Sequence, residues 1–481
     1  MIITDAYIDD IKIPLSEEVN NNIDNENTFT ILIGKNGTGK SSILSKIATT
    51  YIKVQENNSG KKRVDRGSKK VFSFLSKRKF SVHTSSSGNG FITSDDNNRI
   101  YAKKHLFKKC ICVSTSPFDK FPIKGIEDFK EENYYHYIGL KKTDDSYTKE
   151  NLIKFLANTI LTGNSRTKLE KVFETLGYEN EVILKFQKAI TQNLTNLKDR
   201  NIIDVWSKSS KTFNQMIDIE NDLFRSHLRK LLIHDYKSIR DGKDIYRNNS
   251  YFETLSQLSE IPTSFSFNMK NNLNKIQPEK IKNLLNNQLV KVTNVILKKH
   301  KTNKTIDLSV ASSGEQSLLL TLLCIASVID DDCLICIDEP EISLHPEWQQ
   351  IFMTLLSEMF SDYRGCHFII ATHSPLITSN IQSKNAFILQ TDTNELESAD
   401  VFQGRSSDYQ LAMLFKTPGH RNEYLINEIV QIMSKLSLSI EISSELQSRI
   451  DRVLSLKNKI SEKDPIHDLI STIEKAINVS K

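Results

Sequence analysis

The stretch ILIGKNGTGKSSILSKI, residues 31–47, decides the fold, because an apolar run breaks into glycines, a lysine and serines and then resumes with helical spacing. Four residues fit the spacing G-x-x-x-x-G-K-[ST] of a phosphate-binding loop (P-loop): Gly34, Gly39, Lys40 and Ser41. Residues 28–33 predict a buried strand, and residues 41–50 predict a helix with its apolar side chains on one face. Strand, glycine loop and helix are the context that the motif requires, so the sequence predicts a nucleotide site.

The loop residues have separate predicted roles toward ATP and Mg²⁺. Glycines let backbone N–H groups approach phosphate oxygens without an intervening Cβ, and the helix N-terminus adds partial positive charge. Lys40 is expected to reach the β- and γ-phosphates, and Ser41 to hold Mg²⁺. The ATP-binding residues predicted in this segment are Gly34, Asn36, Gly37, Gly39, Lys40, Ser41 and Ser42.

Composition places the chain among ordinary globular proteins. It has 481 residues, of which 38% are hydrophobic and 26% charged, enough for two to four structural units. The net charge of +5 is too mild to establish nucleic-acid binding. The longest apolar stretch, residues 318–329, is too short to span a membrane, and the N-terminus lacks the apolar segment of a signal peptide. We therefore expect a cytoplasmic protein without a membrane partner.

Apolar periodicity and composition predict an α/β fold with four regions. The regions are an N-terminal lobe of a nucleotide-binding head (1–130), a largely helical insertion (131–300), a C-terminal lobe of the head (301–400) and a helical C-terminal region (401–481). In the last region, helices are predicted at 423–436 and 446–456.

The insertion could be compact or could form a coiled-coil arm. Segments 152–162 and 186–197 have helical spacing. The apolar spacing is not sustained over several heptads, and Pro262 and Pro278 interrupt it. A compact helical insertion is the favoured prediction.

A basic segment follows the P-loop helix within a polar, glycine- and serine-rich stretch at 56–99. Residues 60–80 carry nine Lys or Arg side chains against one Asp. We expect a surface loop. Either it is simply solvated, or it contacts the phosphate backbone of DNA or RNA, which would be a salt-sensitive and sequence-independent interaction.

The segment CLICIDEPEISLHPEW, residues 333–348, supplies the second half of the site. Its apolar residues 334–337 predict a buried strand that ends in Asp338 and Glu339. Asp338 is expected to bind the Mg²⁺ that Ser41 holds, and Glu339 to polarise the attacking water as general base. The C-x-x-C pattern in this strand is compatible with zinc or redox chemistry, but no second ligand pair follows, so buried core thiols are favoured.

Two further segments flank that strand. In ASSGEQSLLLTLLCIASVI (311–329), Ser312 and Ser313 are expected to cap a helix that starts around Glu315, either as an anion site or as an ordinary cap. In CHFIIATHSPLI (366–377), a strand is expected to end just before His373. This histidine would hydrogen-bond the γ-phosphate or hold the water-activating carboxylate.

In this order the motifs resemble those of ABC-type ATPases, in particular the soluble branch that includes RecF-like, SMC-like and OLD proteins. SGEQ (313–316) is similar to the ABC signature, and His373 matches the switch histidine. The resemblance implies that two heads dimerise head to tail, with ATP sandwiched between the P-loop of one subunit and the signature helix of the other. The signature residues that would contact nucleotide in trans are Ser313, Gly314, Glu315 and Gln316.

Two departures from that family pattern leave alternatives open. No glutamine stands at the expected Q-loop position, where the segment STSPFDKF (114–121) offers Ser116 or Asp119 instead. No aromatic residue directly precedes the P-loop as an adenine stacker, which leaves Tyr7 as the candidate.

The sequence after the last motif has neither the acidic pattern of a Toprim nuclease nor an H-N-H constellation. The chain therefore resembles an ATPase component that works with a separate nuclease or toxin effector, as in Septu-type, retron-associated and PARIS-type antiphage systems. Residues 134–141 and 402–425 add to this resemblance. We expect a nucleotide-controlled switch that forms a homodimer or higher homo-oligomer. The alternatives are a RecF- or SMC-type repair ATPase acting directly on DNA, and a non-enzymatic scaffold that binds ATP but scarcely turns it over.

Overall fold

The computed structural model describes residues 1–17, 26–56, 69–75, 79–85, 89–94, 99–100, 106–116, 118–123, 134–139, 149–162, 166–188, 261–270, 276–286, 289–302, 304–342, 344–381, 383, 385–437 and 443–480. The chain packs into two compact units, one of Met1–Thr148 with Ser312–Lys481 and the other of Lys149–Ala311. Every residue predicted to bind or hydrolyse ATP belongs to the first unit.

A seven-stranded sheet forms the centre of the first unit, with the strand order β17-β16-β3-β15-β14-β8-β9. The strands are β3 (Thr28–Ile33), β8 (Lys109–Ser114), β9 (Tyr135–Gly139), β14 (Cys333–Asp338), β15 (His367–Ala371), β16 (Ala386–Gln390) and β17 (Glu395–Ser398). All neighbours are parallel except β17, which is antiparallel to β16. The continuous apolar runs of the central strands are typical of a parallel sheet covered on both faces.

A six-stranded antiparallel sheet forms the second layer, with the order β2-β1-β4-β5-β6-β7. Its strands are β1 (Ile2–Ile8), β2 (Ile11–Pro14), β4 (Lys69–Leu75), β5 (Lys79–Thr84), β6 (Gly90–Ser94) and β7 (Arg99–Ile100). The expectation of a loop over 60–80 was therefore wrong at 69–75 and 79–80. Short apolar runs containing Phe72, Phe74 and Phe80 bury in the core and outweigh the surrounding lysines. The remaining basic residues of that segment lie outside the described residues.

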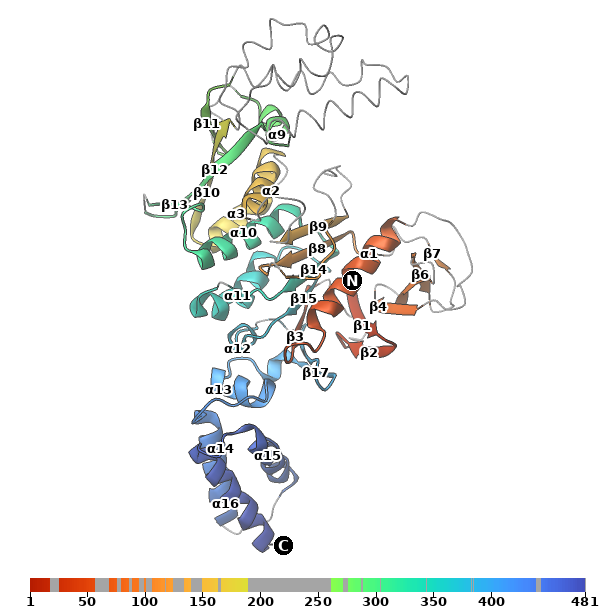
Figure 1. Ribbon diagram of the computed structural model, residues 1–481, viewed down its shortest axis with the longest axis vertical. Coiled ribbons are helices and arrows are strands. Elements are labelled where there is room, and N and C mark those ends of the chain that lie inside the picture. Colours follow the sequence, from red (N-terminus) through yellow and green to blue (C-terminus); the bar gives the residue numbers. More distant parts are fainter. Residues whose placement is uncertain are drawn as a thin grey trace, which may run out of the picture. The chain divides into compact units, whose positions relative to one another are not determined.

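Helix α1 (Lys40–Glu56) packs between these two sheets (Figure 1). It buries Leu44 and Ile47 in a core that contains Phe74 of the antiparallel sheet and Leu334 of β14. Burial of such side chains stabilises the fold by about 1.5–3 kcal/mol each. Packing on both sides fixes the N-terminus of α1, where the P-loop ends.

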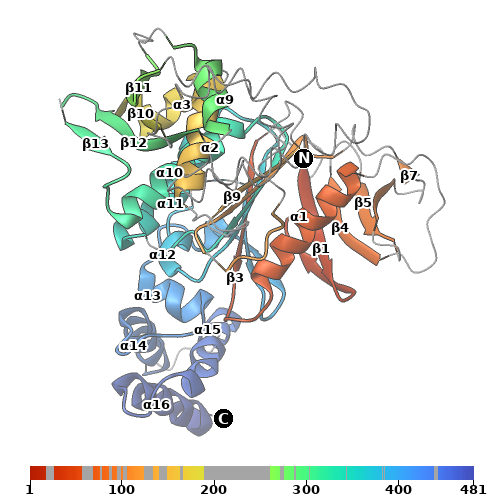
Figure 2. The same ribbon diagram turned by 45° about the horizontal axis from the view of Figure 1, so that its top comes forward.

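The other face of the parallel sheet is covered by α10 (Ser313–Val328) and α11 (Pro346–Met359), on the side opposite α1 (Figure 2). From Leu318 onward nearly every side chain of α10 is buried, which agrees with a helix that is apolar all round. Short α12 (Pro375–Thr378) follows β15. Within the described part of the chain, no helix has both the length and the apolar character needed to cross a membrane.

The C-terminal region continues the first unit and has its own apolar cluster. Its elements are η3 (Ala399–Val401), α13 (Ser407–Tyr409), the π-helix η4 (Gln410–Leu414), α14 (Glu423–Ser437), α15 (Ser444–Ser455), η5 (Lys457–Lys459) and α16 (Pro465–Ser480). Ile429, Ile450 and Ile470 are fully buried in this cluster. Helices α14 and α15 confirm the helices predicted at 423–436 and 446–456.

The second unit combines helices with a sheet. Its four-stranded sheet has the order β11-β10-β12-β13. The strands are β10 (Tyr178–Lys188), β11 (Ser264–Asn268), β12 (Val290–Lys299) and β13 (Thr305–Asp307). The helices are α2 (Lys149–Thr162), α3 (Arg166–Thr175) and α9 (Pro278–Asn286).

Helix α2 confirms the helix predicted at 152–162, but the helix predicted at 186–197 was wrong where it can be tested. Residues 186–188 belong to β10, because Val182, Leu184 and Phe186 are buried with a period of two. The rest of that segment lies outside the described residues. The insertion therefore includes a sheet that its helical spacing did not predict.

The cysteines are buried thiols, as the sequence favoured. Cys333 and Cys336 are fully buried, and both are free. The sulfurs of Cys110, Cys112 and Cys336 lie within 4.8 Å of one another in the sheet core. Burial raises the pKa of the Cys110 and Cys112 thiols, so these two groups remain protonated at neutral pH.

Candidate active site

The P-loop is anchored to the strand beside it. Thr391, which follows β16, donates its backbone N–H to the carbonyl of Ile33 at 2.8 Å, and its Oγ1 lies 2.7 Å from Oγ1 of Thr38. Gly34 has φ +150°, and a Cβ built there would lie 2.2 Å from Oγ1 of Thr391. The first glycine is therefore required by the close approach of the neighbouring strand end.

The rest of the loop suits a polyphosphate. Gly37 and Gly39 have φ +85° and +95°, and a Cβ added at either would meet nothing within 4 Å, so the backbone there borders open space. Nζ of Lys40 donates to the carbonyl oxygens of Gly34 (2.9 Å) and Lys35 (3.1 Å), which places its charge across the loop. The residues therefore fit the phosphates of ATP.

Ser41 and Asp338 lie together as predicted for a Mg²⁺ site. The Ser41 hydroxyl donates to Oδ1 of Asp338 at 3.0 Å. The pKa of Asp338 is raised to about 7, mainly because the carboxyl group is buried. The hydrogen bond from Ser41 opposes this rise in pKa, and the charges of Glu339 and other nearby carboxylates add to it. A divalent cation would offset that crowding of negative charge, and oxygen donors are the ligands Mg²⁺ prefers. The donor set fits the ion.

Glu339 has an unusual backbone conformation that its neighbours hold in place. Its φ is +49°, in the left-handed region that non-glycine residues seldom adopt. Its N–H donates to the carbonyl of Ala371 at 2.9 Å, and its own carbonyl accepts a 2.8 Å bond from Oγ1 of Thr115. The hydrogen bonds that maintain this strained conformation come from the ends of the two strands beside β14. Backbone strain of this kind is typical of functional sites.

His373 lies between the P-loop lysine and Glu339. Its Nδ1 is 3.5 Å from Nζ of Lys40, and its Nε2 is 3.9 Å from Oε1 of Glu339. Burial and the nearby Lys40 charge lower the pKa of His373, so the ring is neutral at neutral pH. Nδ1 of the ring faces the ammonium group of Lys40, and Nε2 faces the carboxylate of Glu339. The structure thus brings Lys40, Glu339 and His373 together.

Sequence reasoning missed Glu341, which positions the segment that carries His373. The carboxylate accepts a 2.6 Å bond from the His373 backbone N–H and a 2.9 Å bond from Oγ1 of Thr372. Burial raises the pKa of Glu341, and these two donors oppose that rise. The sequence signal was the third acid in the run DEPE, two positions after Glu339.

Helix α10 starts at Ser313, two residues earlier than predicted, and its cap is Ser312, whose Oγ accepts the N–H of Glu315 at 3.3 Å. Ser313 is exposed and Gly314 is buried. The roles of Ser313, Gly314, Glu315 and Gln316 toward a nucleotide in trans stay predictions.

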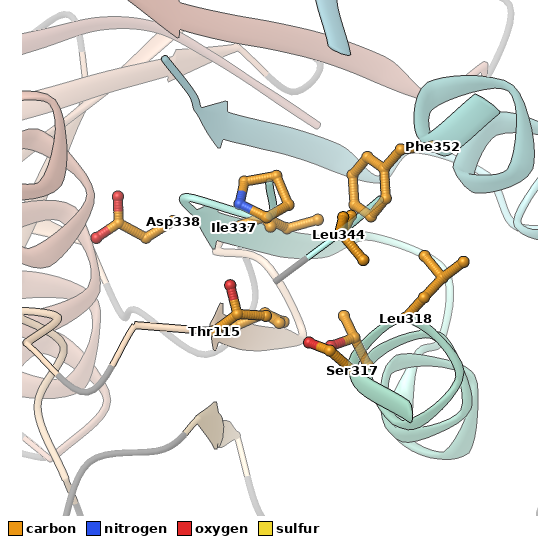
Figure 3. Close-up of a pocket in the computed structure, with 10 residues that line it drawn as sticks. Thr115, Ser317, Leu318, Ile337, Asp338, Leu344 and Phe352 are labelled. Carbon is orange, nitrogen blue, oxygen red and sulfur yellow. The ribbon is translucent and has the colours of Figure 1, made fainter. Parts of the chain in front are cut away.

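A cavity of about 10 Å³ separates α10 from β14 (Figure 3). Ser317 and Leu318 line it together with Asp338, whose carboxylate points away from the apolar side chains in the view. The part of α10 that borders the strand of Asp338 within one chain is therefore one turn beyond Ser313.

The segment at the expected Q-loop position uses its polar groups locally. Asp119 accepts from the Tyr137 hydroxyl (2.6 Å) and from the Phe121 N–H (2.9 Å), and the buried Ser116 hydroxyl accepts from the Phe118 N–H. Lys120, which sequence reasoning did not identify, donates a 2.9 Å bond to Oγ of Ser42 beside the P-loop.

The adenine-stacking candidate lies on the antiparallel sheet. The ring of Tyr7, in β1, has Nζ of Lys70 at 4.7 Å from its centroid. Such a contact is a cation–π interaction. Its role toward a base stays a prediction.

Comparisons with known proteins agree with this geometry. A family model described as an AAA ATPase domain matches residues 7–378. The chain is 24% identical over 460 residues to the Retron Ec83 probable ATPase of Escherichia coli, which covers 89% of this chain and 78% of that relative. A local match to the Retron Vc95 probable ATPase of Vibrio cholerae serotype O1 biovar El Tor is 34% identical over 64 residues, 13% of this chain and 11% of the relative.

Among solved structures, the SMC head domain from Thermotoga maritima is similar to this chain at 11% identity and a TM-score of 0.30, covering 81% of this chain and 95% of that one. The resemblance of the sequence to ATPases of retron-associated systems is confirmed by the curated relatives.

Proposed function

The chain belongs to the family of AAA ATPase domains, and we propose that it hydrolyses ATP as a switch that controls a separately encoded nuclease or toxin in antiphage defence. The observation that carries the proposal is the meeting of P-loop, acidic strand end and histidine at one edge of the parallel sheet. Ser41 bonds to Asp338, and Lys40 and Glu339 flank His373.

Each of these groups has a distinct task in ATP hydrolysis. The P-loop amides and Lys40 bind and orient the phosphates, which accounts for much of the catalysis of phosphoryl transfer. Mg²⁺ held by Ser41 and Asp338 would neutralise charge on the phosphate oxygens. Glu339 accepts the proton of the attacking water, and Nε2 of the neutral His373 ring faces Glu339. Glu341 fixes the backbone from which His373 extends.

The switch rests on a second copy of the chain. Ser313 is exposed at the N-terminus of a long helix, where backbone N–H groups and the helix dipole favour an anion. A phosphate on the P-loop of a partner copy would provide that anion. Hydrolysis then removes the bridge between the heads, so ATP favours a closed homodimer, or a higher homo-oligomer, and ADP releases it.

The effector is proposed as a separate protein because the motifs of the sequence resemble those of ATPases that work with a separately encoded partner. The two relatives described above are named as probable ATPases of retrons. The resemblance in the sequence is to ATPases that act beside a nuclease or toxin. The C-terminal helices α14–α16, which have their own core, are the candidate contact surface for it.

The test uses the chain expressed with its neighbouring genes and challenged with phage. Wild type should protect the cells, and Lys40→Ala should not, while Lys291→Ala, an exposed lysine of β12 in the second unit, serves as the matched control. In parallel, tagged Glu339→Gln protein is purified with ATP and Mg²⁺. A stoichiometric partner with nuclease or toxin motifs supports the proposal. No protection by wild type, together with a lone ATP-dependent dimer whose ATPase responds to DNA, would instead support a repair-type clamp.

A further inference from the structure

A cleft of about 610 Å³ opens beside the P-loop. Part of its lining is residues 34–36 together with His373, the side chain that faces Lys40 and Glu339. Another part comes from the C-terminal region and includes Lys416 and Lys459. Both lysines lie beyond residue 378, where the match to the family model ends.

Positive charge dominates this cleft. Lys35, Lys416 and Lys459 line it against one acidic residue, Asp392, whose Oδ1 accepts the backbone N–H of Lys35 at 3.3 Å. The pKa of Lys459 is lowered by partial desolvation and then by the charges of Lys416 and Lys35, while Asp392 opposes the shift. The three cations therefore repel one another across the cleft, and an anion placed between them would relieve that repulsion.

The backbone places both C-terminal lysines rigidly. Lys416 has φ +51° and lies two residues after the end of the π-helix η4. The N–H groups of its neighbours Phe415 and Thr417 donate 2.9 Å bonds to the carbonyls of Gln410 and Leu411. Lys459 ends η5 and precedes Ile460, which is buried in the C-terminal cluster.

Among the residues that the structure describes, neither lysine has a strong partner. Lys416 has one ion pair, 3.9 Å to Glu395, and both side chains are well exposed, so this pair contributes little. A phosphate oxygen would be a better partner for either ammonium group.

We propose that Lys416 and Lys459 bind the terminal phosphate of the ATP held by the P-loop, so that the C-terminal region senses ATP but not ADP. This inference rests on the proposed ATP site and adds regulation to it. The chemistry recognised is a phosphate group. Its two sources are the γ-phosphate of bound ATP, to which we commit, and free inorganic phosphate.

The test measures equilibrium binding of ATP, of ADP and of inorganic phosphate to full-length Glu339→Gln protein, a background chosen to suppress turnover. In that background, Lys416→Gln combined with Lys459→Gln removes two charges and keeps a polar, unbranched aliphatic stem at each position. We expect ATP affinity to fall about tenfold or more and ADP affinity to change less than about twofold. Lys416→Arg with Lys459→Arg should restore ATP affinity, and Lys291→Gln, at an exposed side chain of β12, should change the affinity for neither nucleotide.

Three results would overturn the inference. An equal loss of affinity for ATP and for ADP would show that the lysines contact the diphosphate or nucleoside part of the nucleotide. Unchanged affinity for both nucleotides would show that the lysines do not belong to the nucleotide site. Unchanged nucleotide binding with loss of inorganic phosphate binding would assign the cleft to the free ion. The proposed ATP site is tested separately: it would be wrong if Glu339→Gln protein with both lysines intact did not bind ATP.

Discussion

The hydroxyl of Ser41 donates a 3.0 Å hydrogen bond to Oδ1 of Asp338, although 297 positions separate the two residues in the chain. Sheet order explains the contact. Asp338 pairs with Ala371 at the end of β15, and Ala371 pairs with Leu32, one residue before the end of β3, so three strands reach the same edge of the sheet. In parallel sheets of this kind, ligands bind outside the carboxyl ends of the strands.

Gly34→Ala should disable the P-loop. The new Cβ would lie 2.2 Å from Oγ1 of Thr391 at a φ of +150°, so the loop must move away from the strand end that anchors it. We expect ATP affinity to fall about tenfold or more. Gly419→Ala is the matched control, because nothing lies within 4 Å of a Cβ there. Calorimetric titration with ATP measures both, and equal affinities for the two variants would contradict the role assigned to Gly34.

Glu341→Gln should slow turnover more than it weakens ATP binding. The amide presents an NH₂ group where the carboxylate accepts bonds from His373 N–H and Thr372 Oγ1, so one buried donor loses its partner and His373 shifts. We expect kcat to fall about tenfold or more and KM to change less than about threefold. Glu358→Gln, on the exposed face of α11, is the control. A loss confined to KM would refute a positioning role.

The buried His367 should make the fold sensitive to acid. Its Nδ1 accepts the Ile3 N–H at 3.0 Å, and burial lowers its pKa from 6.5 to about 3. Above pH 6.5 the ring is neutral in both folded and unfolded chains, so it adds no pH dependence. Between pH 6.5 and 3 the unfolded chain takes up a proton that the folded chain does not, which lowers the free energy of unfolding by up to ~1.4 kcal/mol per pH unit.

Thermal melts between pH 7 and 5 test this prediction. Wild type should lose Tm more steeply on acidification than His367→Gln. His345→Gln, at a side chain that is 67% exposed, should keep the wild-type slope. Parallel slopes for wild type and His367→Gln would show that this ring does not control acid stability.

Ser313→Arg should prevent ATP-dependent dimerisation without removing ATP binding. Ser313 is exposed at the start of α10, where a long side chain would block close approach of a partner copy but leave the P-loop of its own chain intact. In the Glu339→Gln background with ATP, light scattering should report a dimer, and the added Ser313→Arg change should give a monomer that still binds ATP. A dimer that survives the arginine would exclude the proposed head-to-tail sandwich.

The sequence predicted the central strands and the residues at their ends because both signals are local. An apolar run ending in Asp338 and Glu339 predicts a buried strand and the candidate site at its end without knowledge of the sheet order. The β4–β6 strands were missed because lysines and serines hide short apolar runs. Lys416 was missed because its relation to the P-loop depends on how the C-terminal region packs, and no local pattern encodes that contact. Glu341 was missed because its hydrogen bond to the His373 backbone is a tertiary contact, which the local sequence does not encode.

The most direct test of the central claim compares ATP binding and phosphate release by wild type, Lys40→Ala and Glu339→Gln. Glu339 faces His373 without holding the P-loop, so its amide variant should bind ATP as well as wild type and release phosphate at least about 100-fold more slowly. Lys40→Ala should lose ATP binding. Phosphate release by Glu339→Gln at the wild-type rate would contradict the assignment of this site as an ATPase with Glu339 as its base.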